Sequence, residues 1–179
     1  IAAHWARPFQ FSPDFRDTGI FFPFQDGLIY SDSLLVFGLL AAPLDWVGLD
    51  PSIAFQISLI AISALGYAAT VTLMRLGPRG PWLIAIPTGL IFSFGNGLFT
   101  ASNHPQLIAI SLLAWVPLLW IVSMRSRTPW QSVISALASG AVFGLMFYSA
   151  FYVGWASSIA VIIAGGFFWA SCRFRLVAL

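Results

Sequence analysis

Long apolar stretches, repeated along the chain, limit the possible folds of this sequence more than any other feature. Three of them cover residues 53–75, 82–101 and 107–124. Each is close to the roughly 20 apolar residues with which an α-helix crosses a bilayer. Only 8% of the residues are charged, and Lys and Glu are absent. Because a soluble fold would lack the polar side chains to cover its surface, we expect lipid to surround most of the chain.

The last apolar block, residues 132–171, is too long for one crossing. As a single helix rising 1.5 Å per residue it would be about 60 Å long, twice the hydrocarbon thickness. We expect two helices that turn between residues 147 and 155. The prediction is an all-α, polytopic transmembrane bundle of about five spans over residues 52–179, part of a larger membrane domain.

All arginines after residue 50 occur in pairs next to the apolar stretches. The pairs are Arg75 and Arg79, Arg125 and Arg127, and Arg173 and Arg175. The positive-inside rule makes these pairs cytoplasmic, so the N-terminal loop is expected outside and the C-terminal end inside, in a multi-pass protein of the cytoplasmic membrane. The first fifty residues carry a net charge of −4 and the remainder +6. We attribute this asymmetry to membrane topology and predict no nucleic-acid partner.

Residues 34–44, LLVFGLLAAPL, are apolar over about half the length of a span. We expect them to form a helix along the outer interface, within an external region of residues 1–51. Gly140 and Gly144 are four residues apart, a spacing typical of close helix packing. We expect this pair to pack inside the chain.

Polar residues that could bind a ligand collect on the predicted outer side. Tyr30 and Asp32 belong to the first loop, and Asn103, His104 and Gln106 belong to the connection between the second and third spans. Both histidines and every carboxylate of the chain face outward in this topology. Apart from Arg75 at the end of the first one, the spans contain no Asp, Glu, His or Arg, which disfavours a coupled transporter with an intramembrane ion path.

Each candidate also has a purely structural interpretation. Ser31, Asp32 or Ser33 could cap the interfacial helix, which would contribute about 1 kcal/mol. Asn103, His104 and Gln106 could cap the ends of two spans around Pro105. Three hydrogen-bonding side chains within four residues exceed what capping needs, so we favour a ligand-contacting role for this cluster.

Metal binding and other common catalytic motifs have little support in the sequence. The two histidines and six aspartates show no HxxxH or DxD spacing, and there is no nucleophile elbow, phosphate-binding loop or cysteine pair. We therefore assign no metal site and no fixed cofactor, and whether a divalent metal takes part stays open.

Three segments resemble the bacterial GT-C type of polytopic membrane glycosyltransferases. They are YSD at residues 30–32, HPQL at 104–107 followed by WVPL at 115–118, and SAFYVG at 149–154. The resemblance implies transfer of a sugar from a polyprenyl-phosphate carrier to an acceptor on the outer face. It implies Asp32 as the catalytic carboxylate and Tyr30, Asn103, His104 and Gln106 as substrate-binding residues.

The family generally keeps an acidic residue soon after its first span, a position that would precede residue 1, so the catalytic acid could also lie upstream. The expected partners are membrane lipid, the lipid-linked sugar donor and an acceptor of unknown identity. The alternative from another class is a non-catalytic polytopic protein, such as a lipid or polysaccharide transporter or a scaffold subunit, because a shared architecture does not secure activity.

Overall fold

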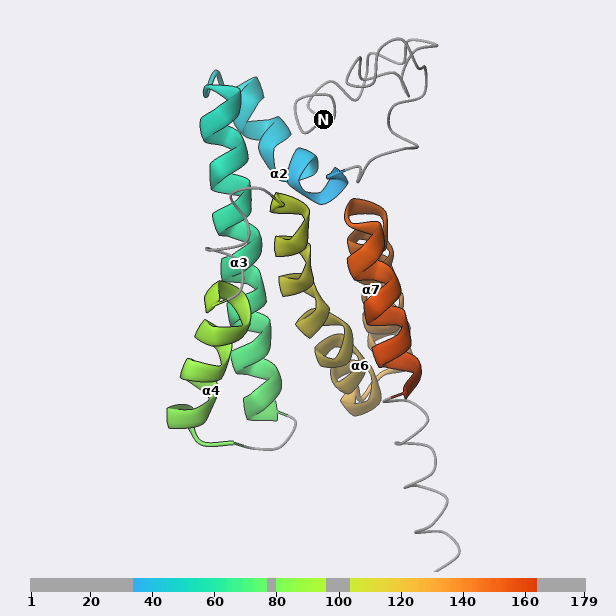
Figure 1. Cartoon of the computed structure of the whole chain (residues 1–179). Coiled ribbons are helices and arrows are strands. Elements are labelled where there is room, and N and C mark those ends of the chain that lie inside the picture. Colours follow the sequence, from blue (N-terminus) through green and yellow to red (C-terminus); the bar gives the residue numbers. More distant parts are fainter. Residues whose placement is uncertain (1–33, 77–79, 96–103, 164–179) are drawn as a thin grey trace, which may run out of the picture.

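The structure, a computed structural model, describes residues 34–76, 80–95 and 104–163, and all of its regular elements in these ranges are helices (Figure 1). This confirms the predicted all-α fold. In chain order the elements are α2 (Leu35–Trp46), α3 (Pro51–Leu76), α4 (Trp82–Leu90), the π-helix η2 (Ile91–Gly95), the 3-10 helix η3 (Pro105–Ala114), α6 (Trp115–Arg125), α7 (Pro129–Ser149) and the helix Phe151–Ile163.

Helix α3 is the longest element and matches the predicted first span of residues 53–75. It begins at Pro51, whose fixed φ suits the first helical position. The Asp50 carboxylate caps this end, because its Oδ1 accepts a hydrogen bond of 2.8 Å from the Ser52 amide. The helix ends at Leu76, after a basic residue in its last turn.

The chain is helical from Gln106 to Arg125, which confirms the helix predicted over residues 107–124. The type of helix differs from the expected α-helix in the first half. Its first half, η3, is a 3-10 helix of 10 residues and continues directly into α6. Runs of 3-10 helix beyond three or four residues are uncommon, because the hydrogen-bond geometry is poorer than in an α-helix. At the transition, the Trp115 indole N–H donates to the Leu65 carbonyl of α3 at 3.1 Å.

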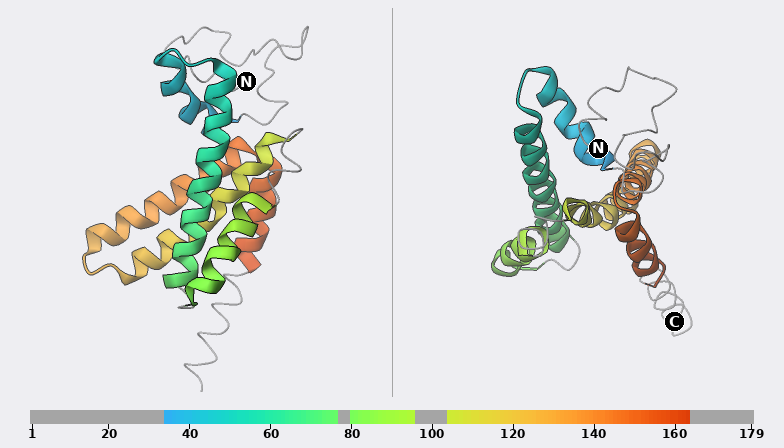
Figure 2. Two further views of the ribbon diagram at one scale, coloured as in Figure 1. Left: turned by 90° about the vertical axis from the view of Figure 1, so that its left-hand side faces the viewer. Right: turned by 45° about the horizontal axis from the view of Figure 1, so that its top comes forward.

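Helix α3 and η3 lie close together at Gly66. A Cβ atom at this position would lie 2.5 Å from the Ser111 Cβ and 2.6 Å from the Ser111 carbonyl oxygen. Only glycine allows the two backbones to come so near, as in helix pairs that pack through small residues in membranes. In the right-hand view of Figure 2, α3 and α4 lie on one side of the η3–α6 path and α7 lies on the other.

The block that follows Arg127 folds back on itself, as predicted. Helix α7 ends at Ser149, Ala150 leaves the helical conformation with φ −148° and ψ 88°, and a new helix starts at Phe151. The new helix leads from this break back toward the other end of the bundle (Figures 1 and 2). Gly154 permits the sharp turn, because a Cβ there would lie 2.7 Å from the Cα of Phe147.

Among the described residues, three helical segments are long and apolar enough to cross a membrane, which makes this chain a membrane protein by the length and composition of its helices. They are Pro51–Leu76, Gln106–Arg125 and Pro129–Ser149. Trp82–Gly95 and Phe151–Ile163 are shorter within the described residues. Because the predicted second and fifth spans continue beyond those residues, the total of five spans stays a prediction.

The short apolar helix predicted at residues 34–44 is present as α2. Figure 1 shows it lying obliquely across one end of the bundle, against α3. Its inner side is buried through Val36 and Phe37, whereas Trp46 and Val47 at its far end are exposed. This distribution suits a helix at a membrane surface, and its position at the outer interface stays a prediction.

The expectation that Gly140 and Gly144 pack inside the chain is wrong for the part of the chain that the structure describes. Both glycines are exposed, and no neighbouring atom lies within 4 Å of the position of a Cβ on either of them. Helix α7 instead turns Ser139, Met146 and Ser149 inward. The small-residue pair therefore faces away from the described helices.

Candidate functional site

Of the five predicted site residues, His104 and Gln106 lie within the described residues. They stand at the start of η3, where the Gln106 Nε2 is 3.3 Å from the His104 Nδ1. The other three, Tyr30, Asp32 and Asn103, lie outside the described residues. Asp32 precedes the first described residue, Leu34, by two positions, and Asn103 directly precedes His104.

His104 occupies the capping position of η3 through its backbone. Its carbonyl accepts a hydrogen bond of 3.0 Å from the Leu107 amide, whereas its side chain makes no capping hydrogen bond. The imidazole is exposed and Gln106 is half-buried. Capping therefore does not account for the His104 side chain, which is available for a ligand together with the carboxamide beside it.

Ser149 connects the start of α2 to the end of α7. Its hydroxyl oxygen accepts a hydrogen bond of 2.9 Å from the Val36 amide, and its carbonyl accepts one of 3.3 Å from the Leu34 amide. Ser149 is completely buried. The amide of Val36 is thus capped by a residue more than one hundred positions away, and the predicted capping residues Ser31, Asp32 and Ser33 lie outside the described residues.

The backbone of Leu34 is held in an unusual conformation at this junction. Its φ of 52° lies in the left-handed region, which a branched, bulky side chain adopts only at a cost of about 1 kcal/mol or more. The two hydrogen bonds to Ser149 hold the chain there. Ser149 therefore fixes the entry into α2, a contact that the sequence did not reveal.

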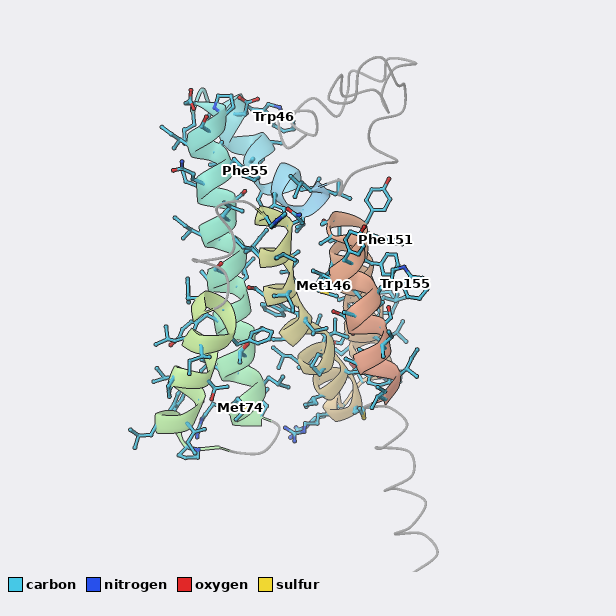
Figure 3. The ribbon with its side chains drawn as sticks, in the orientation of Figure 1. Trp46, Phe55, Met74, Met146, Phe151 and Trp155 are labelled. Atoms are coloured by element: carbon cyan, nitrogen blue, oxygen red, sulfur yellow. The ribbon has the colours of Figure 1, made fainter. Side chains whose placement is uncertain are left out.

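An apolar cluster next to this junction packs together α2, η3 and the residues on both sides of the α7 break. Val36 and Phe37 of α2, Ile108 and Leu112 of η3, and Met146, Ala150 and Val153 around the α7 break are all buried in it. Figure 3 shows Met146 between α7 and the η3–α6 path, whereas Phe151 and Trp155 lie on the outer side. The start of α2, the start of η3 and the break after α7 therefore meet at one end of the bundle, whereas the YSD segment lies outside the described residues.

Exposed aromatic side chains surround the break after α7. The Phe147 and Phe151 rings are 5.6 Å apart in an edge-on arrangement, and the Trp155 ring lies 6.2 Å from each of them. Tyr152 joins this group through Phe151 at 6.0 Å. Aromatic side chains of this kind suit a membrane interface or contact with a sugar or lipid chain.

Charged groups in the described part of the chain separate by end. Asp45 and Asp50 lie where α2 meets α3, at the end with Ser149, and Arg75, Arg125 and Arg127 lie at the opposite helix ends (Figure 1). Among the described residues, no three His, Cys, Asp or Glu side chains come together to hold a metal ion. In these residues the candidate site thus consists of hydrogen-bonding groups, an imidazole and aromatic rings.

Comparisons of the chain with known protein families, with characterised proteins and with solved structures found no match. The fold defines the class: an all-α helical bundle built from membrane-spanning lengths of helix.

Proposed function

We propose that this chain belongs to a membrane-embedded glycosyltransferase that transfers a sugar from a polyprenyl-phosphate donor to an acceptor on the extracytoplasmic face. The observation that supports the proposal is the meeting of α2, η3 and the α7 break at one end of the bundle. Ser149 fixes the start of α2, and η3, which starts after His104, packs in the same apolar cluster. Two of the three segments of the resemblance, HPQL and SAFYVG, thus lie at this end, and Asp32 lies outside the described residues.

The chemistry assigns a role to each residue. Asp32 takes the proton of the acceptor hydroxyl while the acceptor oxygen forms a bond to the anomeric carbon. The bond from that carbon to the phosphate oxygen of the donor breaks, and the polyprenyl phosphate leaves with the electron pair. His104, with Asn103 and Gln106, donates hydrogen bonds to the departing phosphate, and Tyr30 contacts the sugar.

The orientation follows from the arginines. In the proposed topology the end with Arg75, Arg125 and Arg127 faces the cytoplasm, and α2, His104 and the aromatic group around Phe151 face outward. The protein resides in the cytoplasmic membrane in this arrangement. A lipid-linked donor then reaches the site from the outer leaflet.

Transfer of radiolabelled sugar from polyprenyl-phosphate donors tests the activity in membranes that contain the protein. Asp32→Asn is expected to lower the rate about 100-fold or more, because a general base contributes 10²–10⁴-fold, and His104→Ala about tenfold or more. Asp45→Asn is the matched control, since it makes the same chemical change at an aspartate of α2 and is expected to retain activity.

The outcomes separate the alternatives. Loss of transfer in Asp32→Asn and His104→Ala, with normal membrane insertion, supports the proposal. Full activity in both variants contradicts the assigned site and places the catalytic acid elsewhere. If no donor supports transfer by the unaltered protein, the non-catalytic transporter or scaffold function takes its place.

Cysteine labelling tests the orientation independently of activity. In a Cys172→Ser background, Tyr152→Cys is expected to react with a membrane-impermeant thiol reagent from outside, because Tyr152 is 78% exposed at the proposed outer end. Thr128→Cys, exposed in the α6–α7 connection, is expected to react only after the membrane is opened. The reverse pattern would overturn the topology.

A further inference from the structure

The end of the bundle opposite the candidate site carries a concentration of positive charge. Arg75 stands in the last turn of α3, Arg125 ends α6, and Arg127 lies in the connection to α7. Asp50 is the last acidic residue of the chain, so no Asp or Glu follows to neutralise these arginines from neighbouring positions. Figure 1 shows that the C-terminal end of α3 and the α6–α7 connection lie at the same end of the bundle.

Arg75 is held in place from two sides. Its Nη1 donates a hydrogen bond of 2.6 Å to the Gly80 carbonyl, and the central carbon of its guanidinium lies 4.5 Å from the centre of the Trp82 ring system. The Gly80 amide donates to the Met74 carbonyl at 3.0 Å, which fastens this acceptor to the last turn of α3. The guanidinium is thereby oriented in advance of any ligand.

Arg125 reaches the same helix end from α6. Its Nη1 donates a hydrogen bond of 2.9 Å to the Leu76 carbonyl, which is the last residue of α3. A guanidinium has five N–H donors, and the contacts with described residues use one donor of Arg75 and one of Arg125. Two cations therefore gather at the end of α3, and the partial negative charge of a helix C-terminus offsets only part of their repulsion.

The surroundings of these arginines suit an amphiphile rather than a soluble anion. Trp82 and Trp130 are 56% and 72% exposed, as expected for aromatic residues at a membrane surface. The α6–α7 connection is well fixed, because the Ser123 hydroxyl donates to the Ser132 carbonyl at 2.8 Å. Apolar helices begin directly beside the charged groups, where acyl chains would lie next to the headgroups.

We propose that this arginine end binds the phosphate of an anionic phospholipid, with Arg75 and Arg125 as its direct contacts. Arg127, exposed at the same end, adds to the attraction. Guanidinium forks bind phosphate oxygens through pairs of hydrogen bonds. In a zwitterionic headgroup, the lipid's own positive charge offsets the negative charge of the phosphate, so an anionic phospholipid is preferred. The proposal requires that the chain spans a membrane, and it stands whether or not the protein transfers sugar.

Native mass spectrometry of the purified protein measures this preference directly. The protein is reconstituted in nanodiscs of equal parts phosphatidylcholine and phosphatidylglycerol, and the ratio of the two lipids that stay bound after release is determined. We expect enrichment of phosphatidylglycerol by roughly fivefold for each arginine, the factor that corresponds to about 1 kcal/mol per arginine near an anionic surface. The double variant Arg75→Gln with Arg125→Gln is expected to lose the part of the phosphatidylglycerol enrichment that these two arginines contribute.

Two further variants distinguish the charge from its geometry and from folding. Arg75→Lys with Arg125→Lys keeps the charge without the fork and is expected to retain part of the enrichment. Ser126→Ala alters the same connection without a change of charge and is expected to retain all of it. The lipid ratio is measured within each variant, so a lower yield of folded protein does not change it.

The proposal is overturned if the unaltered protein shows no enrichment, or if the double glutamine variant keeps the full ratio. It is also overturned if millimolar inorganic phosphate abolishes the preference, because the site would then bind free phosphate rather than lipid. Enrichment that survives phosphate and disappears with both guanidiniums supports it.

Discussion

Helices α3 and α7 are both long enough to span a membrane, yet they use their small residues in opposite ways. In the most apolar 18-residue window of each helix, 33% of the window is buried in α3 and 17% in α7. A Cβ added to Gly66 of α3 would lie 2.6 Å from the Ser111 carbonyl oxygen of η3, whereas a Cβ added to Gly140 or Gly144 of α7 would meet nothing within 4 Å. A glycine in an apolar helix therefore does not by itself identify an internal contact.

The largest effect is expected for Gly66→Ala. The added methyl group would lie 2.6 Å from the Ser111 carbonyl oxygen, a backbone atom that can move only if the two helices separate. We expect a loss of about 3 kcal/mol in the free energy of unfolding, despite the better helix propensity of Ala. Unfolding in mixed micelles with increasing sodium dodecyl sulfate measures the loss.

Gly89→Ala is the matched control for that variant. Its Cβ would also be close to α3, at 2.8 Å from the Val71 Cγ2 and 2.9 Å from the Tyr67 Cδ2, but these are side-chain atoms that can rotate away. A smaller loss than for Gly66→Ala is expected. Equal losses would mean that the α3–η3 crossing is no more restrictive than the α3–α4 contact.

The turn after α7 gives the next effect in size. Gly154→Ala would place a methyl group 2.7 Å from the Cα and 2.5 Å from the Cδ2 of Phe147, so both the backbone and the ring would have to shift. We expect a loss of about 2 kcal/mol in the free energy of unfolding. Tryptophan fluorescence, which senses Trp155 beside the ring, follows the same transition. An unchanged stability would contradict the close packing of the two helices at this turn.

The sequence was sufficient to predict the elements whose boundaries depend on local chemistry. The first span begins and ends near its capping Asp50 and its basic Arg75, and the fold-back of residues 132–171 follows from length alone. The 3-10 conformation of η3 was not predicted, because an apolar stretch has the same composition in either helix type. The outward direction of Gly140 depends on which helices pack against α7. This choice is a property of the tertiary structure, and no local sequence pattern encodes it.

A medium effect is expected for Ser149→Ala, which tests the junction at the candidate site. The Val36 amide would lose its hydrogen-bond acceptor in a buried position, which costs about 1–2 kcal/mol. We expect faster hydrogen exchange at the first turn of α2 and lower stability. Ser158→Ala is the control, because the Ser158 hydroxyl bonds only within its own helix, to the Gly154 carbonyl. If both variants behave alike, Ser149 does not hold α2.

The candidate site, too, was predictable only where a feature depends on the local sequence. His104 and Gln106 could be selected as site candidates because polar side chains next to a span are easily recognised in an apolar sequence. Ser149 could not, since a serine inside an apolar helix usually bonds to its own backbone, and its bond to Val36 depends on tertiary structure. Ser149 is the first residue of the SAFYVG segment, but the sequence did not indicate its contact with Val36.

The smallest effect is expected for Gly140→Ala combined with Gly144→Ala. Nothing lies within 4 Å of either added methyl group, so the change should only improve helix propensity, by up to about 1 kcal/mol per residue. In the same unfolding assay that detects Gly66→Ala, we expect unchanged or slightly higher stability. A clear loss would mean that a helix outside the described residues, or another protein chain, packs on this face of α7. The contrast between the two helices would then reflect the identity of their partners, because both would use glycine for close packing.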